Sequence, residues 1–507
     1  MDLANNLLLG LQVAMEPMTL AYCFFGVLLG TVVGVLPGIG ALAAISLLLP
    51  ITYHIEPTAA IIMLAGVYYG AQYGGSTAAI LLNLPGTPSS AVTCLDGYPM
   101  AQKGRAGLAL FITTIASLVG AMTGLVLLVL FSPAIAEIGL RFGPAEFFSM
   151  MVLGLVAASS MSIGSAAKGL AMVVLGLLMG MVGTDVNSGV ARFDFGIIEL
   201  TDGINLVALA MGLFGVAEVV RCINSPDMER KPEPVSMKSM VPSRAEFRES
   251  VAPMMRGSAL GAALGALPGV GPSIAAFMSY AIEKRVGRDP KAFGKGAIAG
   301  ISAPESANNA AAQTAFVPSL SLGIPGDAVM AVMLGALIIH GIQPGPMLIS
   351  EQPALFWGLV VSFALGNIML VILNLPTIGI WVALLRIPFA WMYPAILVFV
   401  ALGVYSVNNN EFDIYMVAVL GVVGYALMVL KFEPAPLLLG YILGPMLEEN
   451  LRRTLLLSRG DPMVLIERPI SGSLLGVTAV MLVWTIWSTV RRQIAAKRQL
   501  DLAEAAA

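Results

Sequence analysis

Apolar stretches alternate with short polar ones along the whole chain, and Gly and Pro interrupt many of the apolar stretches. A helix needs about 20 mostly apolar residues to cross a bilayer. Membrane-crossing segments are expected near 59–101, 108–131, 146–163, 169–184, 204–220, 297–340, 355–375, 389–407, 413–430, 434–448 and 473–490. This pattern predicts an all-α polytopic membrane protein with about 11–12 spans.

The composition supports the same class. Of the 507 residues, 58% are hydrophobic and 11% are charged, whereas a soluble globular protein carries roughly 25% charged residues. So few charged residues cannot form the solvated surface of a soluble protein of this length. The surplus apolar surface must therefore face lipid. The 54 Gly and 31 Pro are also informative, because both residue types interrupt helices. The three Cys and two His form no disulfide or zinc motif, and the net charge of −3 gives no sign of nucleic-acid binding.

The two halves of the chain repeat each other. Residues 26–40 read GVLLGTVVGVLPGIG and residues 257–271 read GSALGAALGALPGVG, and a shift of 231 makes eight of the fifteen positions identical. A second pair of motifs follows, NLPGTP at 83–88 and GIPGD at 323–327, with extra residues before it in the second half. Duplicated hydrophobic halves are the sequence sign of a secondary transporter.

The charges beside the repeated motifs place the halves in opposite orientations. Lys and Arg concentrate in cytoplasmic loops. The motif around Pro268 has Arg256 before it, and after it come Lys284, Arg285, Arg288, Lys291 and Lys295. The motif around Pro37 is flanked only by Asp2, Glu16, His54 and Glu56. The motif therefore enters the membrane from opposite faces, which predicts two inverted-topology repeats.

Each repeat is expected to contain a re-entrant helical hairpin and then a broken transmembrane helix. The arms 22–36 and 41–53 have 15 and 13 residues, too few for a span. Irregular backbone at the Pro-Gly tip is tolerated in a membrane only inside protein or beside a water-filled cavity. The second motif breaks the following helix, and the restarted half would point free N–H groups and a positive dipole end inward, which suits a carboxylate.

These features divide the chain into five parts. They are an N-terminal interfacial helix (1–20), a first inverted repeat (21–221), a cytoplasmic linker (222–256), a second inverted repeat (257–450), and a loop with a final transmembrane helix and basic cytoplasmic tail (451–507). One basic cluster disobeys the charge rule, because Arg452, Arg453, Arg459 and Arg468 would lie outside. Either 434–448 does not span the membrane or this loop is an exception.

The hairpin tips and helix breaks form the expected substrate site. Its residues are Pro37, Gly38, Gly40, Asn83, Gly86, Thr87, Ser89, Ser90, Pro268, Gly269, Gly271, Gly326 and Asp327. Close helix packing explains the glycines at 26, 30 and 34 as well as a functional role does, and a plain turn is the alternative for 83–90. The Asp327 carboxylate would sit at a helix start, or it could ligate a cation.

Polar residues that precede the breaks form the expected ion-coupling site. They are Ser76, Thr77, Glu305, Ser306, Asn308 and Asn309. Polar groups at membrane depth are costly and therefore indicate function. Their oxygens could hold Na⁺, and Glu305 could instead carry a proton; hydrogen bonding between helices is the alternative. No cofactor is expected besides this coupling ion, Na⁺ or H⁺.

Enzyme motifs are missing from the sequence. It has no HExxH and no GxSxG. Segment 287–296 departs from a phosphate-binding loop, because six residues separate its glycines and Gly stands where Ser or Thr should bind magnesium. We therefore expect neither an enzyme nor an ATP-driven pump.

Several long blocks carry a family resemblance. They are GVLPGIGALAAISLLLP (34–50), VYYGAQYGGSTAAILLNLPGTPSSAVTCLDGYPMAQKGRAG (67–107), ALPGVGPSIAAFMSYAIEKR (266–285), FGKGAIAGISAPESANNAAAQ (293–313) and LGIPGDAVMAVMLGALIIHGIQPGP (322–346). The chain resembles the large membrane subunit of the tripartite tricarboxylate transporters, over most of its length up to the region of residue 470. The family's motif positions fall on both expected sites. Asp327 departs from the small or hydroxylated residue expected there, which bears on a trianionic substrate and on ion coupling.

The resemblance implies a bacterial inner-membrane permease that works with a small membrane subunit and a periplasmic solute-binding protein. It implies uptake of citrate or a related carboxylate, coupled to an ion gradient, and it is compatible with a dimer of heterodimers. We expect one bundle to move against the other, in an elevator-like slide. The competing class is a passive channel or pore-forming component for small organic anions.

Overall fold

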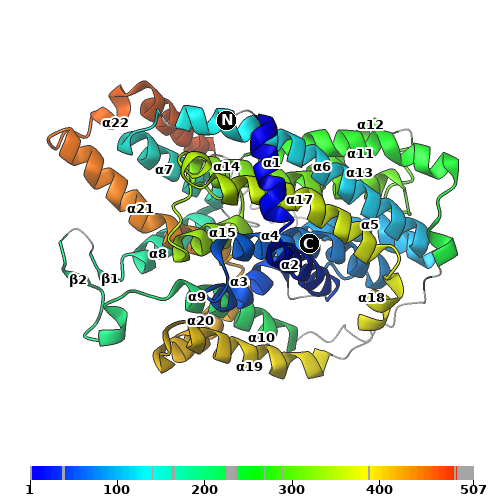
Figure 1. The fold of residues 1–507 in the computed structure, drawn as a ribbon, viewed down its shortest axis with the longest axis horizontal. Helices are drawn as coiled ribbons and strands as arrows, with labels where there is room; N and C mark the ends of the chain where they lie inside the picture. Colours follow the sequence, from blue (N-terminus) through cyan, green and yellow to red (C-terminus); the bar gives the residue numbers. More distant parts are fainter. Residues whose placement is uncertain are drawn as a thin grey trace, which may run out of the picture. The chain divides into compact units, whose positions relative to one another are not determined.

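The computed structural model of the chain is almost entirely helical in its described part (Figure 1). The structure describes residues 3–36, 40–139, 141–160, 166–185, 188–223, 235, 237–267, 270–287, 289–385, 389–484 and 487. The chain forms two compact units: unit 1 is Met1–Leu140 with Asn205–Tyr425, and unit 2 is Arg141–Ile204 with Ala426–Ala507. The prediction of an all-α polytopic membrane protein is confirmed.

Unit 1 holds both repeated motifs. Its elements in the first half are α1 (Leu3–Ala14), α2 (Pro17–Val35), α3 (Gly40–Thr52), α4 (Pro57–Leu82), η1 (Pro88–Ser90), α5 (Ala91–Gln102), α6 (Ala106–Gly139), α9 (Leu206–Ala210), the π-helical η3 (Met211–Val216) and α10 (Ala217–Ile223). In the second half they are η4 (Met237–Met240), α11 (Arg244–Gly265), α12 (Gly271–Val286), α13 (Ala299–Thr314), α14 (Phe316–Leu322), α15 (Ala328–Ile339), α16 (Leu348–Glu351), α17 (Pro353–Asn374), α18 (Ile378–Leu384), α19 (Phe389–Asn408) and α20 (Glu411–Val429), which runs on past the end of the unit.

Four helices in the described part of the chain are long and apolar enough to cross a membrane: α2, α6, α17 and α20. Helix α3 has 13 residues, close to the predicted arm, but α2 begins at Pro17 instead of Tyr22. Pro at the first helical position starts α2 early, because its missing N–H would have no partner there anyway. The length argument for a short first arm was therefore wrong for α2, whose 19 residues suffice to cross.

The glycine ladders of both halves allow close helix packing. Each glycine lies against the backbone of a residue on the following broken helix: Gly26 on Met63, Gly30 on Val67 and Gly34 on Ala71 in the first half, and Gly257 on Ala303, Gly261 on Ala307 and Gly265 on Ala311 in the second. The packing explanation of the ladder therefore holds at equivalent positions of the two repeats. The offset between halves is 231 for the hairpins and 240 for the broken helices.

A buried carboxylate joins the two halves of unit 1. Asp96 of α5 is fully buried. Its Oδ1 accepts hydrogen bonds from the backbone N–H groups of Gly294 (2.9 Å), Gly296 (2.7 Å) and Ala297 (2.8 Å), and its Oδ2 accepts one from the Tyr280 hydroxyl (2.9 Å). All three N–H donors belong to the loop before α13. This set of contacts, the Asp96 clasp, fixes the end of one broken helix to the start of the other.

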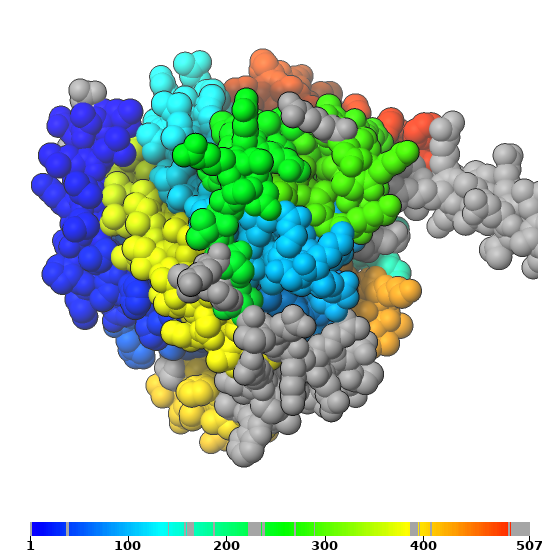
Figure 2. Space-filling view, turned by 90° about the vertical axis from the view of Figure 1, so that its right-hand side faces the viewer, coloured from blue at the N-terminus to red at the C-terminus, as the bar shows by residue number. Residues whose placement is uncertain are grey.

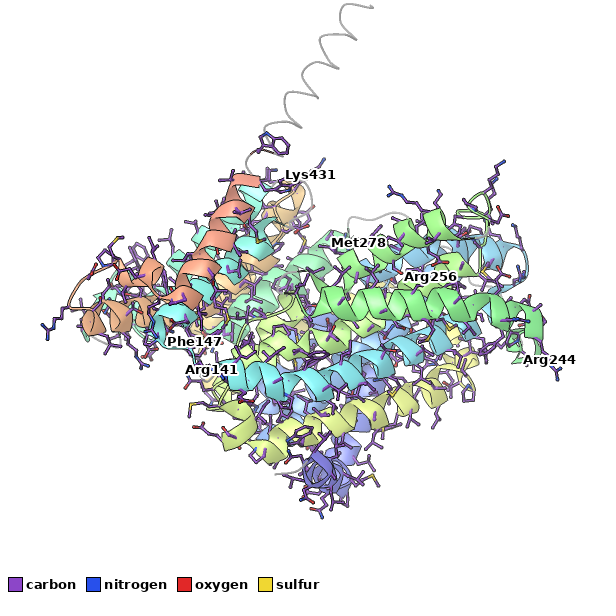
Figure 3. All side chains as sticks on the ribbon, turned by 90° about the horizontal axis from the view of Figure 1, so that it is seen from above. Arg141, Phe147, Arg244, Arg256, Met278 and Lys431 are labelled. Atoms are coloured by element: carbon purple, nitrogen blue, oxygen red, sulfur yellow. The ribbon has the colours of Figure 1, made fainter. Side chains whose placement is uncertain are left out.

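The predicted linker 222–256 is partly helical, because α11 already begins at Arg244 (Figure 3). Ser243 and Glu246 form a capping box, and the hydrogen bonds from Ser243 and Arg105 hold the pKa of Glu246 below its usual value. Arg105 pairs with Glu246 at 2.7 Å. Lys103 Nζ donates to the Lys295 carbonyl at 2.5 Å. The basic loops of the two halves therefore meet at one end of unit 1.

The N-terminal helix α1 packs on α17 (Figure 2). Gly10 lies against the Trp357 backbone and Gly358 against the Val13 side chain. Leu3, Leu8 and Leu11 stay exposed. One face of α1 thus contacts protein and the other is exposed.

Unit 2 is built on two parallel helices. Its elements are α7 (Pro144–Ser160), α8 (Ala166–Gly180), β1 (Gly183–Thr184), β2 (Ala191–Arg192), η2 (Ile198–Leu200), α21 (Ala435–Leu457) and α22 (Val464–Glu467). Gly176 lies against Leu437 and Gly180 against Tyr441, so α8 and α21 run in the same direction. The segment 434–448, whose membrane crossing the charge rule left open, forms about the first two thirds of the continuous helix α21.

Candidate functional site

The first helix break lies between α4 and η1. Asn83 ends α4 in the left-handed conformation with φ of 59°, which Asn tolerates better than most residues. Gly86 is buried against the Gly34 carbonyl and the Gly75 Cα, where a side chain has no room. The break is thus seated on the first hairpin. Asn83 itself is exposed, and its place in the structure is that of a helix C-cap.

Hydroxyl groups gather where the first broken helix restarts. Gln72 Oε1 accepts hydrogen bonds from Ser89 Oγ (2.7 Å) and Thr87 Oγ1 (3.4 Å), and the two hydroxyls lie 3.0 Å apart. Ser90 and Thr87 form a capping box. All four side chains are buried. The structure therefore brings three predicted residues together with Gln72, which the sequence analysis did not assign to the site although it opens the polar run 72–77.

The second break is organised around Asp327. Its Oδ1 caps α15 by accepting from Met330 N (2.8 Å), and its Oδ2 accepts from the Tyr68 hydroxyl of α4 (2.6 Å). A Cβ on Gly271, the first residue of α12, would lie 3.1 Å from Asp327 Cβ. Gly326 packs on Ala315, as its equivalent Gly86 packs on Gly75. The second hairpin, the second break and α4 of the first half thus meet at this carboxylate.

Glu305 of α13 is buried among uncharged polar groups. Thr93 of α5 donates a short hydrogen bond to Oε1, and Ser117 of α6 donates to Oε2 at 3.4 Å. Asn309 Nδ2 donates to Ser117 Oγ (2.8 Å) and to the Glu305 carbonyl (3.1 Å). Within the described ranges Glu305 forms no ion pair. Its neighbours Thr93 and Ser117 were not predicted, because they lie on helices that are remote in sequence.

Several amide oxygens on α13 are buried, and none of them has a hydrogen-bond partner in the part of the chain that the structure describes. They are Oδ1 of Asn308, Oδ1 of Asn309 and Oε1 of Gln313. At the offset of 240 the first half carries Tyr68, Tyr69 and Tyr73 instead. Glu305, Asn309 and Gln313 are spaced by four residues and share one helix face. Carboxylate and amide oxygens are among the ligands that hard cations take in proteins.

The remaining predicted residues have more varied positions. Ser306 Oγ donates to the Met254 carbonyl (2.9 Å) of α11, which ties it to helix packing. Ser76 Oγ donates to the Gln72 carbonyl (3.4 Å), and Thr77 is buried. Gly40 and Gly271 begin the second hairpin arms with φ of 67° and 64°. The tip residues Pro37, Gly38, Pro268 and Gly269 lie outside the described residues.

Among the residues that the structure describes, no three His, Cys, Asp or Glu side chains stand together as a metal site. The polar groups of unit 1 instead lie at two helix breaks and on the helix before one of them. An all-α membrane protein with paired hairpins, paired broken helices and buried polar groups beside them has the features of a secondary transporter.

The comparison with known families agrees with this class. The model of the Tripartite tricarboxylate transporter TctA family matches residues 20–439. The chain therefore belongs to this family of transporter components, and it is a multi-pass membrane protein.

Two relatives come from Agrobacterium vitis. One, described as "Uncharacterized 52.8 kDa protein in TAR-I ttuC' 3'region", is 51% identical over 491 residues, which is 97% of this chain and 98% of the relative. The other, described as "Uncharacterized protein in TAR-II ttuC' 3'region", is 53% identical over 235 residues, which is 46% of this chain and 96% of the relative. No solved structure matches the chain.

Proposed function

We propose that the chain is the large membrane subunit of a binding-protein-dependent secondary transporter in the bacterial inner membrane. It imports tricarboxylates or related carboxylates of the citrate type, and a Na⁺ or H⁺ gradient drives uptake. A small membrane subunit and a periplasmic solute-binding protein complete the transporter, and two such assemblies form a dimer of heterodimers. Membership of a tripartite transporter family supports this proposal at the level of the assembly.

The hydroxyl cluster at the first break is the observation that carries the carboxylate proposal. Thr87, Ser89 and Ser90 are buried at the start of η1 and α5, on a helix that restarts inside the protein. Hydroxyls and helix N–H groups donate to a carboxylate, and the helix dipole favours its negative charge. Asp327 already caps the equivalent helix in the second half. The substrate's charged end therefore binds at the first break, whose backbone is shaped by Asn83 and Gly86.

Glu305 is the proposed coupling residue. A carboxylate buried among hydroxyls and amides in a membrane protein either binds a cation or takes up a proton. The bare oxygens of Asn308 and Asn309 would add ligands for Na⁺. Occupation of this site would stabilise α13 against α5 and α6, which carry Thr93 and Ser117. One bundle then moves against the other, in an elevator-like slide, to expose the substrate to the cytoplasm.

Uptake in proteoliposomes that contain the complete transporter tests the proposal. We expect labelled citrate or a related acid to accumulate only with a Na⁺ or H⁺ gradient, and accumulation after both gradients are collapsed would contradict coupling. Thr87→Ala should raise the KM for substrate, while the control Thr123→Ala, which removes a hydroxyl that donates to the Val119 carbonyl of its own helix, should not. Unchanged uptake by Thr87→Ala would refute the substrate assignment.

The coupling residue has its own test. Glu305→Gln should abolish accumulation and keep counterflow exchange of labelled substrate, because binding survives when coupling is lost. Asn309→Ala should weaken the ion dependence, whereas Asn374→Ala, an equally buried amide on α17, should leave it unchanged. A passive channel would show no saturable counterflow in any variant.

A further inference from the structure

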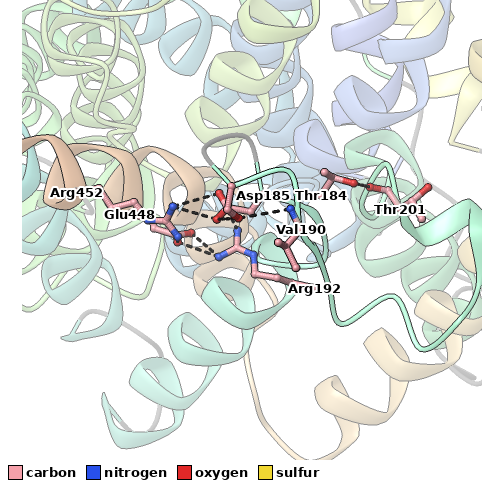
Figure 4. Close-up of polar contacts among 8 residues, drawn as sticks. Thr184, Asp185, Val190, Arg192, Thr201, Glu448 and Arg452 are labelled. Atoms are coloured by element: carbon pink, nitrogen blue, oxygen red, sulfur yellow. Dashed lines mark hydrogen bonds and ion pairs between the residues drawn. The ribbon is translucent and has the colours of Figure 1, made fainter.

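A short β-hairpin in unit 2, formed by β1, β2 and the loop to η2 (183–200), extends away from α8 (Figure 1). Beside it, four charged side chains form a closed network (Figure 4). Arg452 pairs with Asp185 at 3.0 Å and with Glu448 at 2.6 Å, and Arg192 pairs with Glu448 at 2.9 Å. The hairpin's one arginine is therefore turned back toward α21.

In the proposed topology the network lies at one membrane surface. At the opposite end of α8, Lys168 Nζ donates to the Leu430 carbonyl (2.7 Å) just before α21 begins. From Ala435 to Arg452 the helix α21 rises about 25 Å, close to the hydrocarbon thickness of a bilayer. In the proposed topology α6 crosses outward, α7 inward and α8 outward again. The hairpin therefore lies at the external surface.

The hairpin exposes large apolar side chains there. Phe195 is 79% exposed, Ile198 82% and Val190 60%. Phe193 and Phe195 also have left-handed backbones, with φ of 52° and 51°, a conformation that is a genuine outlier for a bulky residue. The segment thus combines exposed apolar surface with backbone strain. Strain of this kind concentrates at functional sites.

Acidic residues border this apolar surface. They are Asp194, Glu199 and Asp202, and within the described parts of the chain none of them forms an ion pair. An apolar centre with a charged rim is the anatomy of a protein interface. The negative charge of this rim distinguishes between possible binding partners. The acidic side chains repel anionic lipid headgroups, and they repel the same acidic surface on a second copy of the chain. The rim attracts a protein surface whose apolar pocket is ringed by Lys and Arg.

We propose that the surface formed by Val190, Phe193, Phe195 and Ile198, with its acidic rim, is the docking site for the soluble solute-binding protein. This inference rests on the proposed function, which supplies such a partner. Phe195 and Ile198 enter an apolar pocket of the partner, and the acidic rim steers the encounter.

Photocrosslinking in intact cells identifies the occupant. Benzoylphenylalanine at position 195, in cells that express the complete transporter, should yield an adduct that mass spectrometry identifies as the solute-binding protein. An adduct with lipid, with the small membrane subunit or with a second copy of this chain would overturn the proposal. The same label at Val241, an equally exposed apolar residue (75%) before α11, is the control and should give no such adduct.

Affinity measurements with the purified membrane subunits in nanodiscs supply the second readout. Phe195→Asn and Ile198→Asn should each weaken binding of the solute-binding protein about tenfold, and Val241→Asn should not. Phe195→Asn should also raise the melting temperature, because Asn tolerates the left-handed backbone better than Phe; a merely structural side chain would lower it. Glu199→Gln should slow association at low salt only.

The outcomes separate the two proposals. Full affinity in both Asn variants refutes the docking site and leaves the proposed function intact. If the unaltered transporter binds no solute-binding protein, the proposed function fails and the docking site fails with it.

Discussion

Replacing Gly30 with Ala should push α2 away from α4. A Cβ on Gly30 would lie 2.5 Å from the Val67 carbonyl oxygen and 2.8 Å from its Cα, whereas ordinary contacts of Cβ atoms begin at 3.4 Å. The two helices must therefore separate by about 1 Å, and overpacking on this scale costs about 1–3 kcal/mol. The equivalent change, Gly261→Ala, meets the Ala307 Cα at 2.5 Å and should cost as much.

The melting temperature of the purified protein in detergent measures this cost. The matched control is Gly379→Ala in α18, where a Cβ would meet nothing within 4 Å. There the helix propensity of Ala should give a gain of up to about 1 kcal/mol. The expected order is thus Gly379→Ala highest, the unaltered protein next, and Gly30→Ala and Gly261→Ala lowest.

A double variant tests the physical reason for the loss. Because the clash at Gly30 involves only backbone atoms of Val67, adding Val67→Ala to Gly30→Ala should not restore stability. Rescue by the double variant, or a melting temperature of Gly30→Ala equal to that of the unaltered protein, would refute the close backbone packing of the two helices.

Three further predictions concern buried polar groups and the first break. Asp96→Ala leaves the buried Ala297 N–H unpaired, at about 1–3 kcal/mol, and removes the shared acceptor of two more exposed N–H groups and a hydroxyl. The protein should therefore aggregate on extraction, as seen by size-exclusion chromatography, unlike the exposed control Asp289→Ala. Arg256→Ala leaves the buried Glu283 carboxylate without the Arg256 guanidinium, which lies 2.5 Å from its Oε1. A double variant that lacks both charges should have a higher melting temperature than Arg256→Ala, because it leaves no unpaired buried charge. A lower melting temperature of the double variant would contradict this argument. Asn83→Gly should keep full uptake, since Gly suits the left-handed C-cap; a raised KM would show that the Asn83 amide binds substrate.

The positions of the hairpins and breaks were predictable because their causes are local. A glycine at every fourth residue allows two helices to pack closely, and Pro-Gly pairs end helices. The packing of Gly30 and Gly261 confirms the predicted correspondence of the two ladders. The start of α2 was predicted too late, because Pro17 was not considered as a first helical residue.

The partners of the polar side chains could not be predicted in this way. Thr93 and Glu305 are 212 residues apart in sequence, and nothing local indicates that α5 and α13 meet. Tyr68 looked like one aromatic residue of a buried helix until the structure placed its hydroxyl on Asp327. The sequence identifies which residues are costly to bury, but only the tertiary packing determines which of them satisfy one another.

The Asp96 clasp makes the duplication unequal. The offset between halves grows from 231 to 240 just before α13, and the inserted loop holds the three N–H groups that bind Asp96. The position equivalent to Asp96 in the other half is Ala336. For a perfectly duplicated inverted protein, the inward-open and outward-open forms would be related by a two-fold rotation about an axis in the membrane plane and would have equal energy. A clasp that joins the halves through Asp96 and has no counterpart at Ala336 removes that degeneracy, so an empty transporter built on this chain has a preferred resting side.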